Sequence, residues 1–212
     1  MVEILKLDPD NPDQPSIDKA ADILREGGII AYPTETFYGL GADAENEKAI
    51  EKIYTIKGRN FKNPISIIIG NRTDVIKLVK DVPETGSLLM NRFWPGGLTI
   101  LFEASHNVPR QLTAGTGKIG IRLSGNLIAT SLAKTFSKAV TATSANLSGQ
   151  KECLSVDDVI DSIGNSVDAI IDGGSTLGRL ASTIVDVTTD PPNIVREGVV
   201  PTTFIFDMLR KA

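Results

Sequence analysis

The chain has 212 residues, of which 41% are hydrophobic and 23% charged, a composition that suits one soluble domain with a packed core. Its formal net charge of -4 argues against a domain built mainly to coat a nucleic-acid backbone, because such domains carry a clear basic excess. A single cysteine, Cys153, and a single histidine, His106, exclude an internal disulfide and any metal cage of several thiolates or histidines.

The start of the chain lacks the features of an export signal. Residues 1–12 turn acidic early and contain no apolar h-region. No apolar run approaches the length that crosses a bilayer. These observations predict a soluble protein located in the cytoplasm.

The first predicted elements alternate between helix and strand. Apolar residues at helical spacing predict a helix over residues 16–26, and the apolar run 28–32 fits a buried strand. Residues 34–41 are too polar for a core strand and too short for a helix. Asn46 then offers an N-cap for a helix that ends near Gly58, a natural residue for the position after a helix end.

The remaining pattern continues this alternation. We expect a helix near residues 155–163, because Ser155 and Asp158 come close to a capping box. The other expected elements are strands at 64–70, 98–102, 118–123, 139–143, 167–171, 183–187 and 193–196, and helices at 73–80, 84–93 and 127–136. The alternation predicts a three-layer α/β fold with helices packed on a sheet, as one domain over residues 1–212 whose last ten or so residues form an appendage.

Two familiar motifs fail on their context. Residues 115–120, Gly-Thr-Gly-Lys-Ile-Gly, match G-x-G-x-x-G, but a predicted strand follows where the dinucleotide fingerprint requires a helix. A P-loop is excluded because Leu112 and Ile119 stand where its glycine and its Ser or Thr are required.

A cationic segment follows the second helix. Five cations lie between Lys48 and Lys62, including Lys57 and Arg59 on either side of Gly58. Cations are favourable at a helix C-terminus, so Lys57-Gly58-Arg59 fits an ordinary helix end. Arg59 and Lys62, however, extend past the helix into a loop ahead of a buried strand. An ammonium and a guanidinium two residues apart can also clamp a triphosphate or a carboxylate.

Two groups of small polar residues and one arginine form three further candidates, each with an ordinary alternative. Residues 143–146, Thr-Ser-Ala-Asn, follow an apolar strand and fit either a sugar or phosphate contact or a simple turn. Thr34 and Thr36 fit a polar ligand or a strand-to-loop turn. Arg122 interrupts an apolar strand, so it either faces out of the core or meets an anion.

The order of these motifs resembles the YrdC family of threonylcarbamoyl-AMP synthases. The matching segments, which are specific in combination and cover roughly residues 15–200, are Tyr32-Pro-Thr-Glu-Thr-Phe-Tyr-Gly-Leu-Gly-Ala-Asp43, Lys57-Gly-Arg59 with Pro64, Trp94-Pro-Gly-Gly-Leu-Thr99, Ile119-Gly-Ile-Arg122, Thr143-Ser-Ala-Asn146 with Ser148-Gly149, Ser182-Thr-Ile-Val-Asp186 and Ile194-Val-Arg-Glu-Gly198. One departure is Asn60, where many members have a proline after the arginine of K-x-R.

The resemblance implies a twisted mixed β-sheet with a concave electropositive cleft, in the single-domain form of the family. It maps a signature tetrad of catalytic residues onto Lys57, Arg59, Ser144 and Asn146. It maps threonine-binding positions onto Thr36, Arg122 and Ser182, with Arg122 holding the carboxylate. Nucleotide contacts map onto Arg59, Asn63, Thr116, Thr143, Ser144 and Arg196, and no metal ligand is implied.

The implied activity is a nucleotidyltransferase that makes threonylcarbamoyl-AMP and pyrophosphate from L-threonine, bicarbonate and ATP. Mg²⁺ accompanies ATP, and the product serves threonylcarbamoyladenosine formation in tRNA, through a downstream transferase complex. Catalysis of this kind needs positioning and charge neutralisation and no covalent nucleophile, which agrees with a sequence that offers no triad and no reactive cysteine.

Three alternatives stay open from the sequence. The first is a double-stranded RNA or tRNA-binding module of the same fold, using the cations between Lys48 and Lys62. The second is another carbamoyl-adenylate-forming activity, as in the related domain of hydrogenase-maturation proteins. The third is an inactive paralogue, which the intact K-x-R and S-x-N pairs disfavour.

Overall fold

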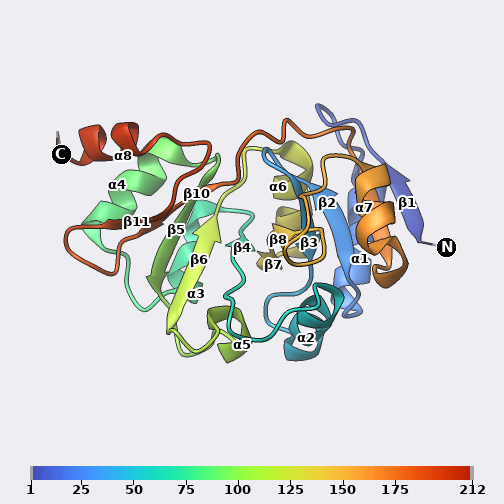
Figure 1. Cartoon of the computed structure of the whole chain (residues 1–212), viewed down its shortest axis with the longest axis horizontal. Coiled ribbons are helices and arrows are strands. Elements are labelled where there is room, and N and C mark those ends of the chain that lie inside the picture. Colours follow the sequence, from blue (N-terminus) through green and yellow to red (C-terminus); the bar gives the residue numbers. More distant parts are fainter. Residues whose placement is uncertain (1, 211–212) are drawn as a thin grey trace.

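The computed structural model describes residues 2–210 and places their strands in two mixed β-sheets, which lie on the two sides of the view in Figure 1. The first sheet has five strands, in the order β1 (Glu3–Lys6), β9 (Ala169–Asp172), β2 (Ile30–Pro33), β3 (Tyr38–Gly41) and β8 (Thr143–Ser144). The second has six strands, in the order β11 (Asn193–Arg196), β10 (Thr183–Asp186), β5 (Leu98–Glu103), β6 (Lys118–Arg122), β4 (Ile67–Ile68) and β7 (Val140–Thr141). The predicted mixed α/β fold is confirmed, with its strands divided between two sheets.

Parallel and antiparallel pairs occur in both sheets. In the five-stranded sheet β9 runs parallel to β1 and β2, while β3 runs antiparallel to both β2 and β8. In the six-stranded sheet β5 pairs parallel with β10 and antiparallel with β6. The segment that contains β7 and β8 passes from one sheet to the other, so the two sheets meet at these short strands.

Eight α-helices cover the sheets. Their bounds are α1 Gln14–Arg25, α2 Glu47–Ile56, α3 Val75–Leu78, α4 Glu84–Phe93, α5 Arg110–Thr113, α6 Leu127–Phe136, α7 Val156–Ile163 and α8 Thr202–Leu209, with 3₁₀ turns at Arg72–Asp74 and Gly164–Ser166. The expected caps are present: the Asn46 side chain accepts from the Ala49 backbone N–H, and Ser155 and Asp158 form a full capping box. Gly58 has the positive φ of 59° expected after a helix end.

The expectation of irregular structure over residues 34–41 is wrong for its second half. Residues Tyr38–Gly41 form the buried strand β3, paired on both sides. The Tyr38 hydroxyl donates to the Gly174 carbonyl oxygen at 2.8 Å, which satisfies the polar end of this buried ring. Two glycines let the Tyr32 ring lie against the strand, because a Cβ on Gly39 or Gly41 would stand 3.2 or 2.8 Å from it.

The expected C-terminal appendage is also wrong for the residues that the structure describes. Residues Thr202–Leu209 form α8, which packs on α4 beside the six-stranded sheet (Figure 1). Ile205 of this helix is fully buried and belongs to the main core. Residues 211–212 of the expected appendage lie outside the described part of the chain.

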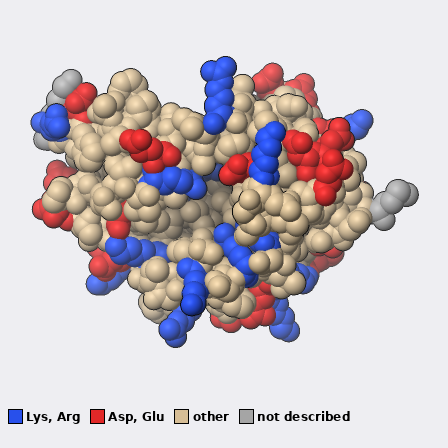
Figure 2. Space-filling model, in the orientation of Figure 1, with Lys and Arg blue, Asp and Glu red and all other residues tan. Residues whose placement is uncertain are grey.

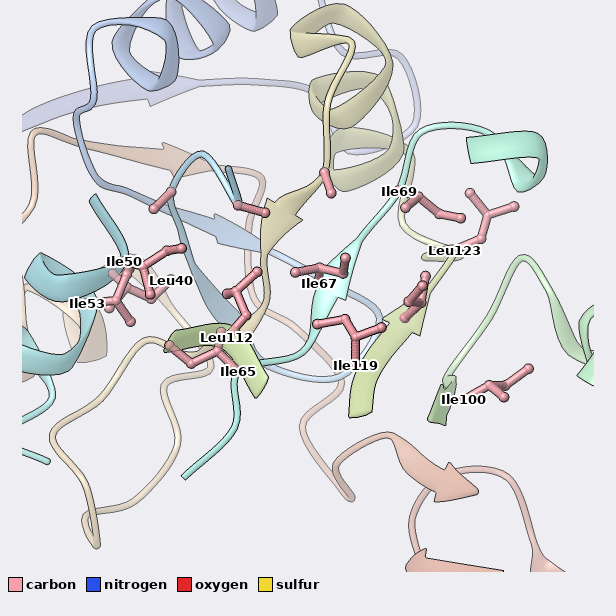
Figure 3. Close-up of a cluster of buried hydrophobic side chains, with 14 of the residues drawn as sticks. Leu40, Ile50, Ile53, Ile65, Ile67, Ile69, Ile100, Leu112, Ile119 and Leu123 are labelled. Atoms are coloured by element: carbon pink, nitrogen blue, oxygen red, sulfur yellow. The ribbon is translucent and has the colours of Figure 1, made fainter. Parts of the chain in front are cut away.

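One hydrophobic core joins the two sheets. It contains Leu40 of β3, Ile53 of α2 and Ile67 of β4 together with Ile100 and Ile119 of the central strands (Figure 3). A second core fills the space between α1, α6 and the outer face of the five-stranded sheet. Shared burial in the first core fixes the distance between the sheets, and with it the shape of the space between them.

The fold bears on two further expectations, one about the glycine-rich segment 115–120 and one about membrane-spanning helices. Gly115 and Gly117, both with positive φ, lead into strand β6 and not into a helix, as expected from the sequence. Within the described residues, no helix combines the length and the hydropathy required to span a bilayer.

Candidate functional site

A cavity of about 250 Å³ lies between the two sheets and carries most of the polar side chains singled out in the sequence. The space-filling view shows a hollow near the middle of one face, with Lys and Arg side chains at its edge (Figure 2). Of the predicted site residues, Thr36, Arg59, Arg122, Thr143, Ser144, Ser182 and Arg196 line the cavity. The structure therefore brings together positions spread over most of the chain.

Four predicted residues do not line this cavity. Lys57 and Asn146 are buried behind its wall, whereas Asn63 and Thr116 are exposed. The Tyr54 hydroxyl contacts the carbonyl oxygens of Asn63 and of Gln111 in α5, at 2.7 and 2.9 Å. The loop of Asn63 therefore lies close to α5, which is followed in the chain by the loop of Thr116.

Lys57 turns inward from the end of α2. Its Nζ donates to the carbonyl oxygens of Ser144 and Asn146 at 2.5 and 2.9 Å, and to Asn146 Oδ1 at 3.2 Å. Ser144 Oγ lies farther away, at 3.5 Å, and the three nearer acceptors are enough to use all three protons of the ammonium group. The expectation that a flexible Lys57 side chain extends into a ligand does not match this arrangement, in which Lys57 holds the Ser144–Asn146 turn.

Burial lowers the pKa of Lys57 from 10.5 to about 8, and the nearby Arg59 guanidinium lowers it further in the same direction. The ammonium form still dominates at neutral pH. The positive charge that holds the turn is thus present under ordinary conditions, but it can be lost at moderately alkaline pH.

The orientation of the Asn146 amide follows from its neighbours. Asn146 Nδ2 donates to the Gln150 carbonyl oxygen at 2.7 Å, so Oδ1 must face Lys57 and Ser144. Ser144 Oγ donates its proton to this Oδ1 at 2.6 Å. The Ser144 hydroxyl consequently faces the cavity only as an acceptor.

Arg59 has unpaired buried nitrogens. Its guanidinium lies over the Tyr54 ring, 5.3 Å from the centroid, and within the described residues neither Nε nor Nη2 has a hydrogen-bond partner. Burial lowers its pKa, although an arginine remains charged. A buried cation with free donors, on the wall of a cavity, is suited to bind an anion.

Arg122 is buried and ion-paired, which agrees with the expectation that it meets an anion. Its Nη1 lies 3.1 Å from Glu35 Oε1, and Ser124 Oγ donates to Glu35 Oε2. Sequence reasoning missed the role of Glu35, because Glu35 lies in the turn between β2 and β3, far in the chain from Arg122 of β6. Glu35 therefore holds one edge of the Arg122 guanidinium, and Arg122 itself lines the cavity.

Arg196 is fixed by Ser182. Its Nε and Nη2 donate to the Ser182 carbonyl oxygen at 3.0 and 2.8 Å, and Nη2 also donates to Ser182 Oγ at 2.9 Å. The Thr99 hydroxyl, another residue missed from the sequence, lies 2.9 Å from Ser182 Oγ. Burial and, secondarily, the charge of Arg122 lower the pKa of Arg196. The two arginines are close enough to repel, and an anion between them would relieve this repulsion.

Glu152 and Cys153 lie next to each other at the same site. Glu152 lines the cavity, and its sequence neighbours gave no signal for this position. Cys153 is buried and its pKa is raised to about 11, first by burial, so it is not a thiolate nucleophile at neutral pH. Among residues 2–210, no group of three or more His, Cys, Asp and Glu side chains is arranged to hold a metal ion.

Comparisons with known proteins agree on the relatives of this chain. The family model Sua5_yciO_yrdC, described as "Telomere recombination", matches residues 22–198. The chain is similar to the threonylcarbamoyl-AMP synthase of Pyrococcus abyssi (strain GE5 / Orsay), with 39% identity over 182 residues, which are 86% of this chain and 54% of that protein. The synthase of Bacillus subtilis (strain 168) is 37% identical over 87% of this chain and 54% of its own. The chain thus spans about half the length of these two curated relatives.

Solved structures of members of this family are also similar to the chain. The structure of P. abyssi Sua5 complexed with L-threonine matches with a TM-score of 0.93 at 35% identity, covering 99% of this chain and 61% of that one. The crystal structure of Escherichia coli YciO matches with a TM-score of 0.86 at 31% identity, covering 95% of this chain and 98% of that one.

Proposed function

Since the chain belongs to the Sua5/YciO/YrdC family, we propose that it makes threonylcarbamoyl-AMP and pyrophosphate from L-threonine, bicarbonate and ATP. The observation that carries this proposal is the set of three arginines on one cavity, of which Arg59 has unpaired buried donors. All three proposed substrates carry negative charge. The name of the similar P. abyssi and B. subtilis proteins and the L-threonine complex of P. abyssi Sua5 support the choice of substrates.

We assign the substrates to parts of the cavity from the charges and hydroxyl groups that line it. Arg122 is proposed to hold the threonine carboxylate, with Thr36 and Ser182 completing the amino-acid site. Arg59, Arg196, Thr143 and Ser144 are proposed to contact the nucleotide from the cavity wall, and Asn63 and Thr116 from the adjoining loops. Lys57 and Asn146 take part by holding Ser144 in place.

The reaction requires two bond-forming steps. The threonine nitrogen forms a bond to the carbon of bicarbonate, water leaves, and a carbamate results. A carbamate oxygen then attacks the α-phosphorus of ATP, the bond to the β-phosphate oxygen breaks, and pyrophosphate leaves. Fixed arginines favour both steps by neutralising the accumulated negative charge and by holding the reactants together. Mg²⁺ is proposed to accompany ATP.

The proposed product would serve threonylcarbamoyladenosine formation next to the anticodon of tRNA, in the cytoplasm, through a downstream transferase. Direct RNA binding is less well supported. Of the five cations from Lys48 to Lys62, Lys57 is buried and Arg59 lines the cavity, so the expected basic surface is reduced.

The test is release of pyrophosphate from ATP by the purified protein, with and without L-threonine and bicarbonate. We expect release that depends on both, and a loss of about 100-fold in Arg59→Ala, because an oriented cation is removed from the reacting anions. Arg92→Ala is the matched control, since Arg92 is exposed on α4 and does not line the cavity. No release above the ATP-only level, together with tight salt-sensitive binding of double-stranded RNA, would refute the enzyme and favour the RNA-binding alternative.

A further inference from the structure

Thr34 lines the cavity beside Thr36 and is almost fully buried, with 3% of its surface exposed. Both residues belong to the turn between β2 and β3. Their hydroxyl oxygens lie 3.0 Å apart, a distance at which either oxygen could be the donor. The surrounding contacts decide which one it is.

The single hydroxyl proton of Thr34 is already used. Thr34 Oγ1 lies 2.7 Å from the Phe37 carbonyl oxygen, and a carbonyl oxygen can only accept. Thr34 Oγ1 also accepts from the Thr36 backbone N–H at 3.2 Å. With its proton given to Phe37, Thr34 can meet the Thr36 hydroxyl only as an acceptor.

The proton of Thr36 must therefore point at Thr34. The Thr36 hydroxyl faces the cavity with its lone pairs and has no proton to offer a ligand. An acceptor such as a carboxylate or phosphate oxygen at this position would meet lone pairs and gain no hydrogen bond. A ligand N–H or O–H would gain one.

We propose that Thr34 is a specificity-determining residue, which fixes Thr36 as a pure acceptor so that Thr36 binds an N–H or O–H donor of the amino-acid substrate. This inference rests on the proposed function. It excludes the substrate carboxylate from Thr36 and leaves the carboxylate to the Arg122 side of the cavity. Of the two donors on threonine, the amine and the side-chain hydroxyl, either has the chemistry that Thr36 accepts.

Two substitutions separate this role from simple packing. Thr34→Val keeps the shape of the side chain but removes the acceptor, so the Thr36 hydroxyl is free to rotate. Thr34→Ser keeps the hydroxyl and serves as the matched control. Binding of L-threonine, L-2-aminobutyrate and (R)-3-hydroxybutanoate to the full chain is measured for both variants and the wild type. The two analogues lack the hydroxyl and the amine of threonine, respectively.

We expect Thr34→Val to weaken L-threonine binding about tenfold and Thr34→Ser to stay within about threefold of the wild type. The loss should persist for the analogue that keeps the contacted donor and vanish for the one that lacks it. Persistence with 2-aminobutyrate assigns the amine to Thr36, and persistence with 3-hydroxybutanoate assigns the side-chain hydroxyl.

Other results would overturn the inference. Equal losses for all three ligands in Thr34→Val indicate a general structural effect, and equal L-threonine affinities of Thr34→Val and Thr34→Ser show that the fixed proton is irrelevant. A wild-type protein that binds no L-threonine refutes the proposed function and this inference with it. If the wild type binds L-threonine normally and either of the first two results is found, the inference fails while the proposed function stands.

Discussion

The two walls of the cavity differ in how much of their hydrogen bonding is satisfied within the protein. The wall from the five-stranded sheet carries Thr34, Thr36 and Ser144, whose hydroxyl protons are all given to protein acceptors. The opposite wall carries Arg122 and Arg196 of the six-stranded sheet, and Arg59 from the loop ahead of β4 completes it with free donors. The hydroxyl groups of the first wall are fixed by protein acceptors, whereas the arginines of the second wall are cationic and incompletely paired; Glu152 is the one acidic side chain among the described lining residues.

This difference sorts the groups of a ligand. Carboxylate and phosphate oxygens gain charge-assisted hydrogen bonds from the guanidinium groups and gain nothing from the hydroxyls of Thr36 and Ser144. Ligand N–H and O–H groups can donate to the hydroxyl oxygens of Thr36 and Ser144, which we call the hydroxyl wall, and a protonated amine is in addition repelled by the arginines. A polar molecule with an anionic end and a donor end therefore has one preferred orientation between the walls, before any chemistry begins.

The largest expected effect comes from removing the Lys57 ammonium, which holds Ser144 of the hydroxyl wall in place. Lys57→Met keeps the length and apolar stem of the side chain but removes the ammonium from under Ser144 and Asn146. We expect the rate of pyrophosphate release to fall by about 100-fold, because small displacements of positioning groups have effects of this size. Steady-state kinetics and circular dichroism of the variant measure the rate and the retained fold.

Lys52→Met is the matched control for this change. Lys52 lies on the same helix, where its ammonium donates to the Gly27 carbonyl oxygen at 2.9 Å, away from the cavity. Its activity should match the wild type. A wild-type rate in Lys57→Met would show that the reaction does not need the ammonium. Lys57 would then be only a cation in a favourable place at a helix C-terminus.

A smaller effect is expected on the charged wall. Arg122→Ala should weaken L-threonine binding about thirtyfold, since a charge-assisted contact is lost, while ATP affinity changes less than about threefold. Isothermal titration calorimetry with each ligand gives both values. In Arg122→Ala the Glu35 carboxylate loses its ion-pair partner. The double variant Arg122→Ala/Glu35→Gln removes this unpaired charge, and we expect that it does not restore threonine binding. Equal losses for threonine and ATP would contradict the assignment of Arg122 to the carboxylate.

The smallest expected effect is on pH dependence. With a Lys57 pKa of about 8, about nine tenths of the ammonium is present at pH 7 and about one tenth at pH 9. The ratio of wild-type to Lys57→Met rates should therefore fall about tenfold over this range, and taking the ratio cancels the titration of the threonine amine. A constant ratio would mean that the charge on Lys57 does not matter.

Stability should change in the opposite direction. The folded protein releases this proton near pH 8, whereas the unfolded chain holds it to about pH 10.5. Because the unfolded state binds more protons between these values, the contribution of Lys57 to the free energy of unfolding rises with pH across that window. Urea unfolding of the wild type and Lys57→Met at pH 7.5 and 10 measures the difference.

Local signals predicted several elements well. The helix α6 has the bounds 127–136 expected from its apolar spacing, and the Ser155–Asp158 capping box opens α7 as expected. These features depend on residues within one or two turns of each other, so the sequence contains the whole cause.

Features that depend on distant partners were not predictable in the same way. Strand β3 is stabilised by the Tyr32 ring and the Gly174 carbonyl group, neither of which the pattern of residues 34–41 reveals. The inward turn of Lys57 depends on three acceptors of the Ser144–Asn146 turn, and the Arg122 pair depends on Glu35. The sequence singled out polar residues of which several line the cavity, but it could not distinguish them from residues such as Lys57 that lie behind its wall.

The pairing of β3 with β8 sets Gly39 opposite Ser144 and Leu40 opposite Thr143. The β2–β3 hairpin can form early because its strands are neighbours in sequence, but it carries Thr36 without Ser144. The hydroxyl wall is complete only when β8, from much later in the chain, has paired with β3, which is a long-range contact. Ligands that need both residues bind only the fully assembled molecule, so their presence during refolding would selectively trap correctly folded chains.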